Sequence, residues 1–82
     1  MNNEQVYAVI TFHTTTEAMA AEKKCTQNHI PGALIPIPGA LSAGCGLAWR
    51  MTSEEYESYK EVMAHSGMRY EQISMLPPKS EG

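Results

Sequence analysis

The sequence predicts an α+β fold in which two helices pack on one face of a four-stranded antiparallel sheet. Two Thr-x-x-Glu segments, at residues 14–17 and 52–55, each offer a hydroxyl and a carboxylate to the unpaired N–H groups of a first helical turn. Short apolar segments lie before, between and after these two helix starts. The chain has 82 residues, which gives room for one hydrophobic core and one domain.

The first predicted strand covers residues 5–12. Both of its alternating faces are largely apolar, so we expect it in the centre of the sheet. The helix that follows should run from residue 14 to about 28 and end at the segment Ile30-Pro31-Gly32, because proline lacks an N–H and disfavours helix in the residue before it. The residues of this helix expected to pack on the sheet are Ala18, Ala21 and Cys25.

Two strands are predicted in the middle of the chain. Residues 33–37 form a short strand that we place at an edge of the sheet, because Pro36 cannot donate a hydrogen bond to a neighbour. A loop of small residues follows over 38–46, and the third strand covers residues 46–51.

The second predicted helix begins at the capping segment of Thr52 and ends at Gly67, a residue that readily takes the left-handed conformation. Its expected apolar stripe is Tyr56, Tyr59, Val62 and Met63. The last strand should cover residues 68–76, which completes one domain over residues 1–76, and residues 77–82 are predicted to be a disordered tail. The order β-α-β-β-α-β is the ferredoxin-like, split βαβ arrangement.

Charge and composition argue against several partners. Six Lys and Arg against nine Asp and Glu give a net charge of −3, whereas nucleic-acid binding depends on clustered positive charge. Tyr7 and Trp49 are aromatic, but the third strand lacks the basic-Gly-aromatic pattern of RNA-binding modules, so we expect Trp49 in the core or at a dimer surface. No apolar run reaches the ~18–20 residues of a membrane span, and the polar start of the sequence leads us to expect no signal peptide. Because two cysteines are too few for a disulfide framework, we expect a cytoplasmic protein.

Cys45 is the residue most suggestive of chemistry. Gly44 and Gly46 flank it, which removes side-chain bulk around the sulfur and lets the backbone adopt positive φ. A partner could then approach closely, and backbone N–H groups could point at the reactive thiolate form. A small buried core residue is the competing interpretation, since free cysteine is often simply buried.

Other polar residues give weaker signals. Arg50 is the nearest cation in sequence, but five residues of strand would put it roughly 16 Å from Cys45. His13 would face the loop around Cys45 if both lie at the same end of the sheet. Cys25 is expected to be an inert core residue, and a disulfide between the two cysteines is possible but not required. The three histidines lack ligand spacing, so we expect no metal site and no cofactor.

Several segments together resemble the small bacterial domains of the Se/S carrier protein-like family, over about residues 6–76. They are the opening strand and histidine of residues 7–13, the capped helix, Ile30-Pro31-Gly32, Leu34-Ile35-Pro36, and Cys45-Gly46-Leu47-Ala48 with Arg50. The family's cysteine maps onto Cys45 and its following glycine onto Gly46. Gly44 stands where the family often has serine or another small residue, and Trp49 replaces a commoner aliphatic residue.

The resemblance implies a carrier of sulfur or selenium rather than an enzyme with turnover of its own. The Cys45 thiolate would attack the outer sulfur of a donor persulfide, such as that of a cysteine desulfurase, and pass the atom to an acceptor protein. The residues expected to support Cys45 are Ser42, Gly44, Gly46, Arg50 and His13. The alternative is a binding or regulatory module, with a structural cysteine, that pairs with a second copy or a partner protein through Tyr7, Thr11 and Arg50 on the open sheet face.

Overall fold

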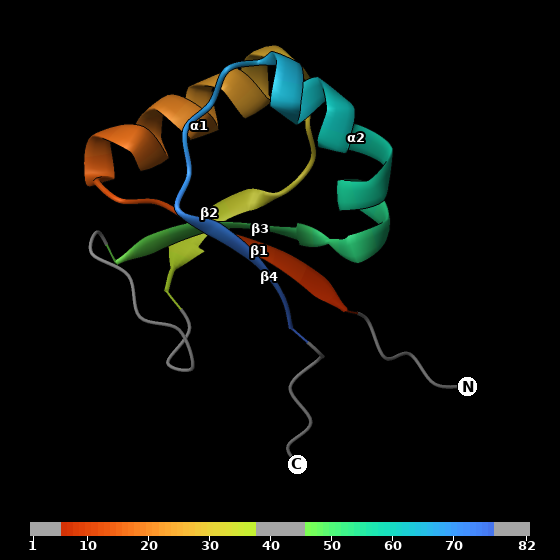
Figure 1. Cartoon of the computed structure of the whole chain (residues 1–82), viewed down its shortest axis with the longest axis horizontal. Helices are drawn as coiled ribbons and strands as arrows, with labels where there is room; N and C mark the ends of the chain where they lie inside the picture. The colour runs from red at the N-terminus through yellow and green to blue at the C-terminus, as the bar shows by residue number, and fades with distance from the viewer. Residues whose placement is uncertain (1–5, 38–45, 77–82) are drawn as a thin grey trace.

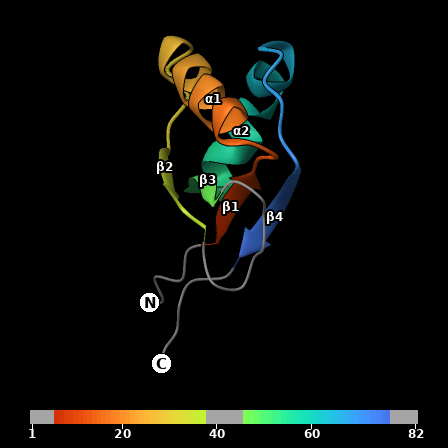
Figure 2. The ribbon, with the colours of Figure 1, turned by 90° about the vertical axis from the view of Figure 1, so that its left-hand side faces the viewer.

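Four strands form one antiparallel sheet in the computed structural model, which describes residues 6–37 and 46–76. Both helices lie on the same side of this sheet (Figures 1 and 2). The elements, in chain order, are β1 (Tyr7–Thr11), α1 (Thr15–Gln27), β2 (Ala33–Pro36), β3 (Leu47–Thr52), α2 (Ser53–His65) and β4 (Gln72–Leu76). Each helix therefore joins two parallel strands that are separated by an antiparallel one, and the predicted ferredoxin-like α+β fold is confirmed.

The strand order is β2-β3-β1-β4, so β1 lies in the interior of the sheet, as its two apolar faces predicted. Ile10 of β1 stands opposite Trp49 of β3 on one side and Ile73 of β4 on the other. Val9, on the alternate parity, is as deeply buried as Ile10. β2 is an edge strand, and Pro36 lies within it, as expected for a residue that cannot donate to a second neighbour.

The hydrophobic core lies between the sheet and the two helices. Trp49 is part of it, and its indole N–H donates to the carbonyl of Pro31 over 3.2 Å. Gly32 lies against this ring with φ of +128°, and a Cβ there would come within 2.5 Å of the indole nitrogen. The prediction of Trp49 in the core is confirmed. Because Tyr7 points to the opposite face, the two aromatics do not form a shared base-stacking surface.

The two helix starts differ in detail. At α2 the Thr52 hydroxyl accepts from the N–H of Glu55, whose carboxylate accepts from the N–H of Thr52, so the predicted capping box is complete. At α1 the Thr14 hydroxyl accepts from the N–H of Glu17. The Glu17 carboxylate, however, accepts from the N–H of His13, one residue before the cap. The first helix therefore ties the preceding residue to its first turn.

Both helices end on a left-handed residue. Gly67 follows α2 with φ of +78°, as the sequence predicted. After α1 the left-handed residue is His29, with φ of +57°, and the N–H of Ile30 donates to the carbonyl of Cys25 over 2.8 Å. This is the Schellman type of helix end, with histidine where glycine is usual. The helix is thus closed before Pro31 is reached.

Three expectations are wrong in detail. β4 begins at Gln72 rather than at residue 68, because Met68 is buried in the core without its backbone joining the ladder. Val62 is 39% exposed and lies outside the apolar stripe of α2, whose buried member is Met63. Thr11 is 1% exposed, and its hydroxyl donates to the carbonyl of Gln72, so it offers little to a partner on the open face.

No helix within residues 6–37 or 46–76 has the length and hydropathy needed to span a membrane. The predicted disordered tail, residues 77–82, lies outside the described residues.

Candidate functional site

The candidate site is tied to the end of the sheet where β3 begins. Gly46 immediately precedes β3, and its carbonyl accepts from the N–H of Ile37 over 3.0 Å, which links the segments just beyond β2 and just before β3. Gly46 is exposed, with φ of +76°, and among the described residues, chain neighbours aside, no atom lies within 4 Å of the position a Cβ would take. Ser42, Gly44 and Cys45 lie outside the described residues, but the peptide bond to Gly46 ties Cys45 to this end of the sheet.

His13 belongs to the same end of the sheet. The register pairs Thr11, the last residue of β1, with Ala48, close to the start of β3, and His13 follows Thr11 by two residues. The ring of His13 is exposed, and its Nδ1 lies 3.3 Å from Oε1 of Glu17, which also accepts from the backbone N–H of His13. The first turn of α1 therefore holds an imidazole–carboxylate pair beside the start of β3. The loop around Cys45 lies outside the described residues, so both the expected position of His13 beside it and the role of His13 stay predictions.

Arg50 is not brought to this end. It shares the open face with Gly46 because the two are an even number of residues apart. Its guanidinium carbon lies 4.9 Å from the centre of the Tyr7 ring, a cation–π contact. Tyr7 stands opposite Thr52, at the other end of β3. The charge of Arg50 is therefore directed away from Gly46.

Cys25 lies on the buried side of α1. Its side chain is 0% exposed, and the thiol is free rather than part of a disulfide. Burial raises the pKa of this thiol from its ordinary 9.0 to about 11, and the charge of Glu22 adds to the effect. Because the thiolate is the form that reacts, Cys25 is both inaccessible and protonated at neutral pH. The prediction of an inert core role is confirmed.

Comparison with known proteins gives one match. A family model described as "Putative Se/S carrier protein-like" matches residues 7–74, from the start of β1 into β4. The chain belongs to this Se/S carrier-like family. No curated protein and no solved structure matches the chain.

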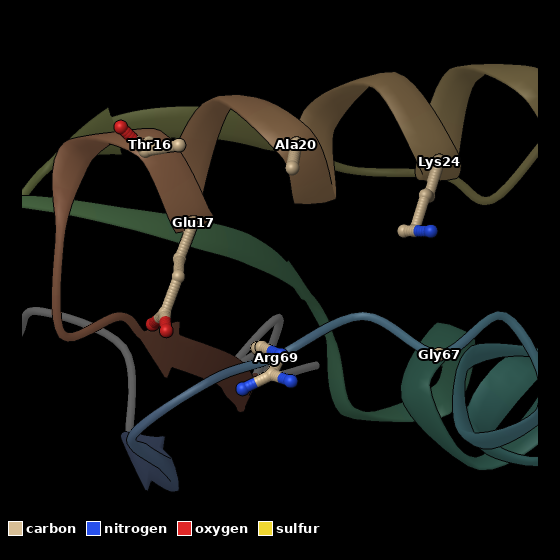
Figure 3. Close-up of a pocket in the computed structure, with 6 residues that line it drawn as sticks. All are labelled: Thr16, Glu17, Ala20, Lys24, Gly67 and Arg69. Carbon is tan, nitrogen blue, oxygen red and sulfur yellow. The ribbon is translucent and has the colours of Figure 1, made fainter.

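In this Se/S carrier-like domain, a groove of about 300 Å³ opens between α1 and the connection that leads from α2 to β4. Figure 3 shows Glu17 and Lys24 extending from α1 toward the connection that carries Arg69. Lys24 and Arg69 form no ion pair with any described residue, whereas Glu17 is engaged with His13. The groove therefore combines two cationic side chains with the carboxylate of Glu17. Its full lining is Thr16, Glu17, Ala20, Lys24, Gly67 and Arg69.

Sequence reasoning missed this groove because its two cations are far apart in the chain and neither belongs to a motif. The part of the chain that the structure describes holds no group of three or more metal-ligating side chains. The described residues offer three features for chemistry: an exposed glycine just before β3, a histidine–carboxylate pair at the first turn of α1, and a groove beside that pair lined by charged side chains of both signs.

Proposed function

We propose that this Se/S carrier-like chain holds a transferable sulfur or selenium atom on Cys45 and passes it between partner proteins. The observation that carries the proposal is the state of Cys25. The sequence contains two cysteines, and Cys25 is fully buried with its pKa raised to about 11. If the family's chemistry uses a cysteine sulfur, Cys45 is the residue left to supply it.

The exchange is balanced without an external oxidant or reductant. The Cys45 thiolate attacks the outer sulfur of a donor persulfide, R–S–SH. A bond forms between the Cys45 sulfur and that outer sulfur, the donor's S–S bond breaks, and the donor leaves as R–S⁻. The product is a Cys45 persulfide, and the Cys45 sulfur is oxidised as the donor is reduced. Transfer to an acceptor thiolate repeats the same step, and a perselenide would follow the same course.

The described surroundings of Gly46 support access and deprotonation. Gly46 has open space around its Cα, so the residue after the sulfur adds no bulk to hinder a second protein. His13 follows β1 by two residues at the end of the sheet where β3 begins, and one nitrogen of its ring lies 3.3 Å from the carboxylate of Glu17. We assign to His13 the acceptance of the Cys45 thiol proton through its other ring nitrogen, which would raise the thiolate fraction.

The partners in this scheme are proteins: a persulfide donor such as a cysteine desulfurase, and an acceptor enzyme that consumes the atom. The exchange belongs in a reducing compartment such as the cytoplasm, where a lone thiol stays free. The alternative, a binding module that uses the open sheet face, is less well supported. Of the residues expected there, Thr11 is buried and Arg50 is already in contact with Tyr7.

The test is intact-mass analysis after incubation of the reduced chain with a cysteine desulfurase and cysteine, or with glutathione persulfide. We expect a gain of one sulfur atom, reversed by dithiothreitol. Cys45→Ser should abolish the gain, and Cys25→Ala should keep it, with circular dichroism used to confirm that both variants fold. A gain that survives in Cys45→Ser and disappears in Cys25→Ala would overturn the proposal.

A further inference from the structure

The two edges of the sheet differ in how well they are protected. The strand order leaves β2 and β4 at the edges. β2 has four residues, and one of them is Pro36. β4 has five residues, Gln72–Leu76, with no proline and no charged side chain. Proline, charge and short length are the features that keep an edge from pairing with another strand, and β4 has neither of the first two.

An apolar groove lies beside β4. It has a volume of about 280 Å³, and its walls come mainly from α2, the connection after α2, and β4 itself. Tyr70 next to the groove is 46% exposed, and Met75 of β4 is 45% exposed. The groove is lined by Tyr56, Met63, Ala64, Tyr70 and Ile73, together with the charged residues Lys60 and Glu61 of α2. The side of β4 that faces away from β1 is thus bordered by incompletely covered apolar surface.

From these features we propose that two copies of the chain pair through β4, as antiparallel strands related by a two-fold axis at Ser74. The sequence of β4 suits this arrangement because it is self-complementary. Ile73 would stand opposite Met75 of the second copy, Gln72 opposite Leu76 of the second copy, and the two Ser74 residues opposite each other.

The faces of β4 support the same register. Ile73 stands opposite Ile10, and Met75 opposite Ala8, so both point to the face that the helices cover. In the pair, two Ile73–Met75 contacts would continue the apolar layer from one copy into the other and shield both grooves. The occupant is a second copy because this register pairs the apolar residues of β4 with one another, and because β4 carries no charge, it sets no like charges opposite each other in two chains of net charge −3.

This surface is separate from the proposed exchange site. β3 lies on the far side of β1 from β4, roughly 10 Å away at the usual spacing between strands. Gly46, at the start of β3, would stay open in both copies of the pair. Dimer formation and sulfur transfer can therefore fail independently of each other.

The test is sedimentation velocity of the full chain over a wide range of protein concentration. We expect a concentration-dependent dimer in the wild type. Ser74→Lys and Ser74→Glu should each raise the dimer dissociation constant by at least ~10-fold, because each puts two like charges opposite each other at the axis. An equimolar mixture of the two variants should form a mixed dimer that native mass spectrometry identifies by its mass.

The matched controls are Ala33→Lys and Ala33→Glu, which place the same charges on the exposed side of edge strand β2 and should leave the dimer unchanged. A wild type that stays monomeric throughout would overturn the proposal. So would a dimer that both Ser74 variants leave intact, a mixture that does not associate, or a dimer that the Ala33 variants disrupt instead.

Discussion

Cys25 and the residue next to Cys45 lie in opposite surroundings. Cys25 is enclosed by α1 and the sheet, at 0% exposure, whereas Gly46 is exposed and has open space where a side chain would project. Burial keeps the Cys25 thiol protonated, whereas Cys45 is followed in sequence by Gly46, which has no side chain. The comparison shows that its position in the core excludes the Cys25 sulfur from exchange, which is why we propose Cys45 for that role.

The packing difference between the two regions predicts a large contrast between two glycine substitutions. Gly32→Ala should lower the free energy of unfolding by about 4 kcal/mol, because it adds left-handed strain to a steric clash. Its Cβ would meet the Trp49 indole nitrogen at 2.5 Å and the carbonyl oxygen of Arg50 at 2.6 Å. Urea unfolding measures the effect.

Gly46→Ala is the matched control. Its φ is also positive, but a Cβ there meets nothing within 4 Å. Only the backbone preference is lost, at about 1 kcal/mol. Equal losses in the two variants would contradict the contrast between a packed and an open region.

The state of the Cys25 thiol predicts a pH dependence of stability. The pKa of Cys25 is raised from 9.0 to about 11 in the folded chain. The unfolded chain therefore loses this proton first as the pH rises. The contribution is fully present below pH 9 and is lost between pH 9 and 11, amounting to about 2–3 kcal/mol at the upper end.

Other groups titrate in the same range, so the measurement is the difference between wild type and Cys25→Ala in urea unfolding at pH 8, 9 and 10. The wild type should lose more stability than the variant as the pH rises. A constant difference across this range would show that the Cys25 thiol is not held in a desolvated site.

The helix end beside Cys25 gives a smaller effect. His29 takes φ of +57° immediately after α1, a conformation that favours glycine. His29→Gly should stabilise the chain by about 1 kcal/mol, partly offset by the greater freedom of glycine in the unfolded state. His29→Ala is the control and should give no gain in the melting temperature, since alanine does not relieve the strain.

Local patterns were enough to predict most of the fold. The two apolar faces of residues 5–12 placed β1 in the interior, Pro36 placed β2 at an edge, and Gly67 ended α2. Each of these follows from the chemistry of one short segment. The start of β4 was misplaced because an apolar pattern indicates that Met68 is buried but not that its backbone pairs with a neighbouring strand.

The site was less predictable because it depends on contacts between distant segments. The separation of Arg50 from Cys45 followed from strand geometry, but its contact with Tyr7 needed the register of β1 and β3. The place of His13, just past β1 at the end of the sheet where β3 begins, needed the same register. Lys24 and Arg69 share one groove only because α1 and the connection after α2 pack side by side. The roles assigned to Ser42, Gly44 and Cys45 stay predictions, because these residues lie outside the described ranges.

The most direct test of the central claim is the rate at which iodoacetamide alkylates each cysteine of the native chain at pH 7.5, measured by peptide mass analysis. With a pKa of about 11 rather than 9.0, Cys25 has a thiolate fraction about 100-fold lower than an ordinary thiol, and burial slows it further. Cys45 should therefore react at least ~100-fold faster than Cys25, and the two rates should converge in urea. Equal rates in the native chain, or faster labelling of Cys25, would contradict the assignment of exchange to Cys45.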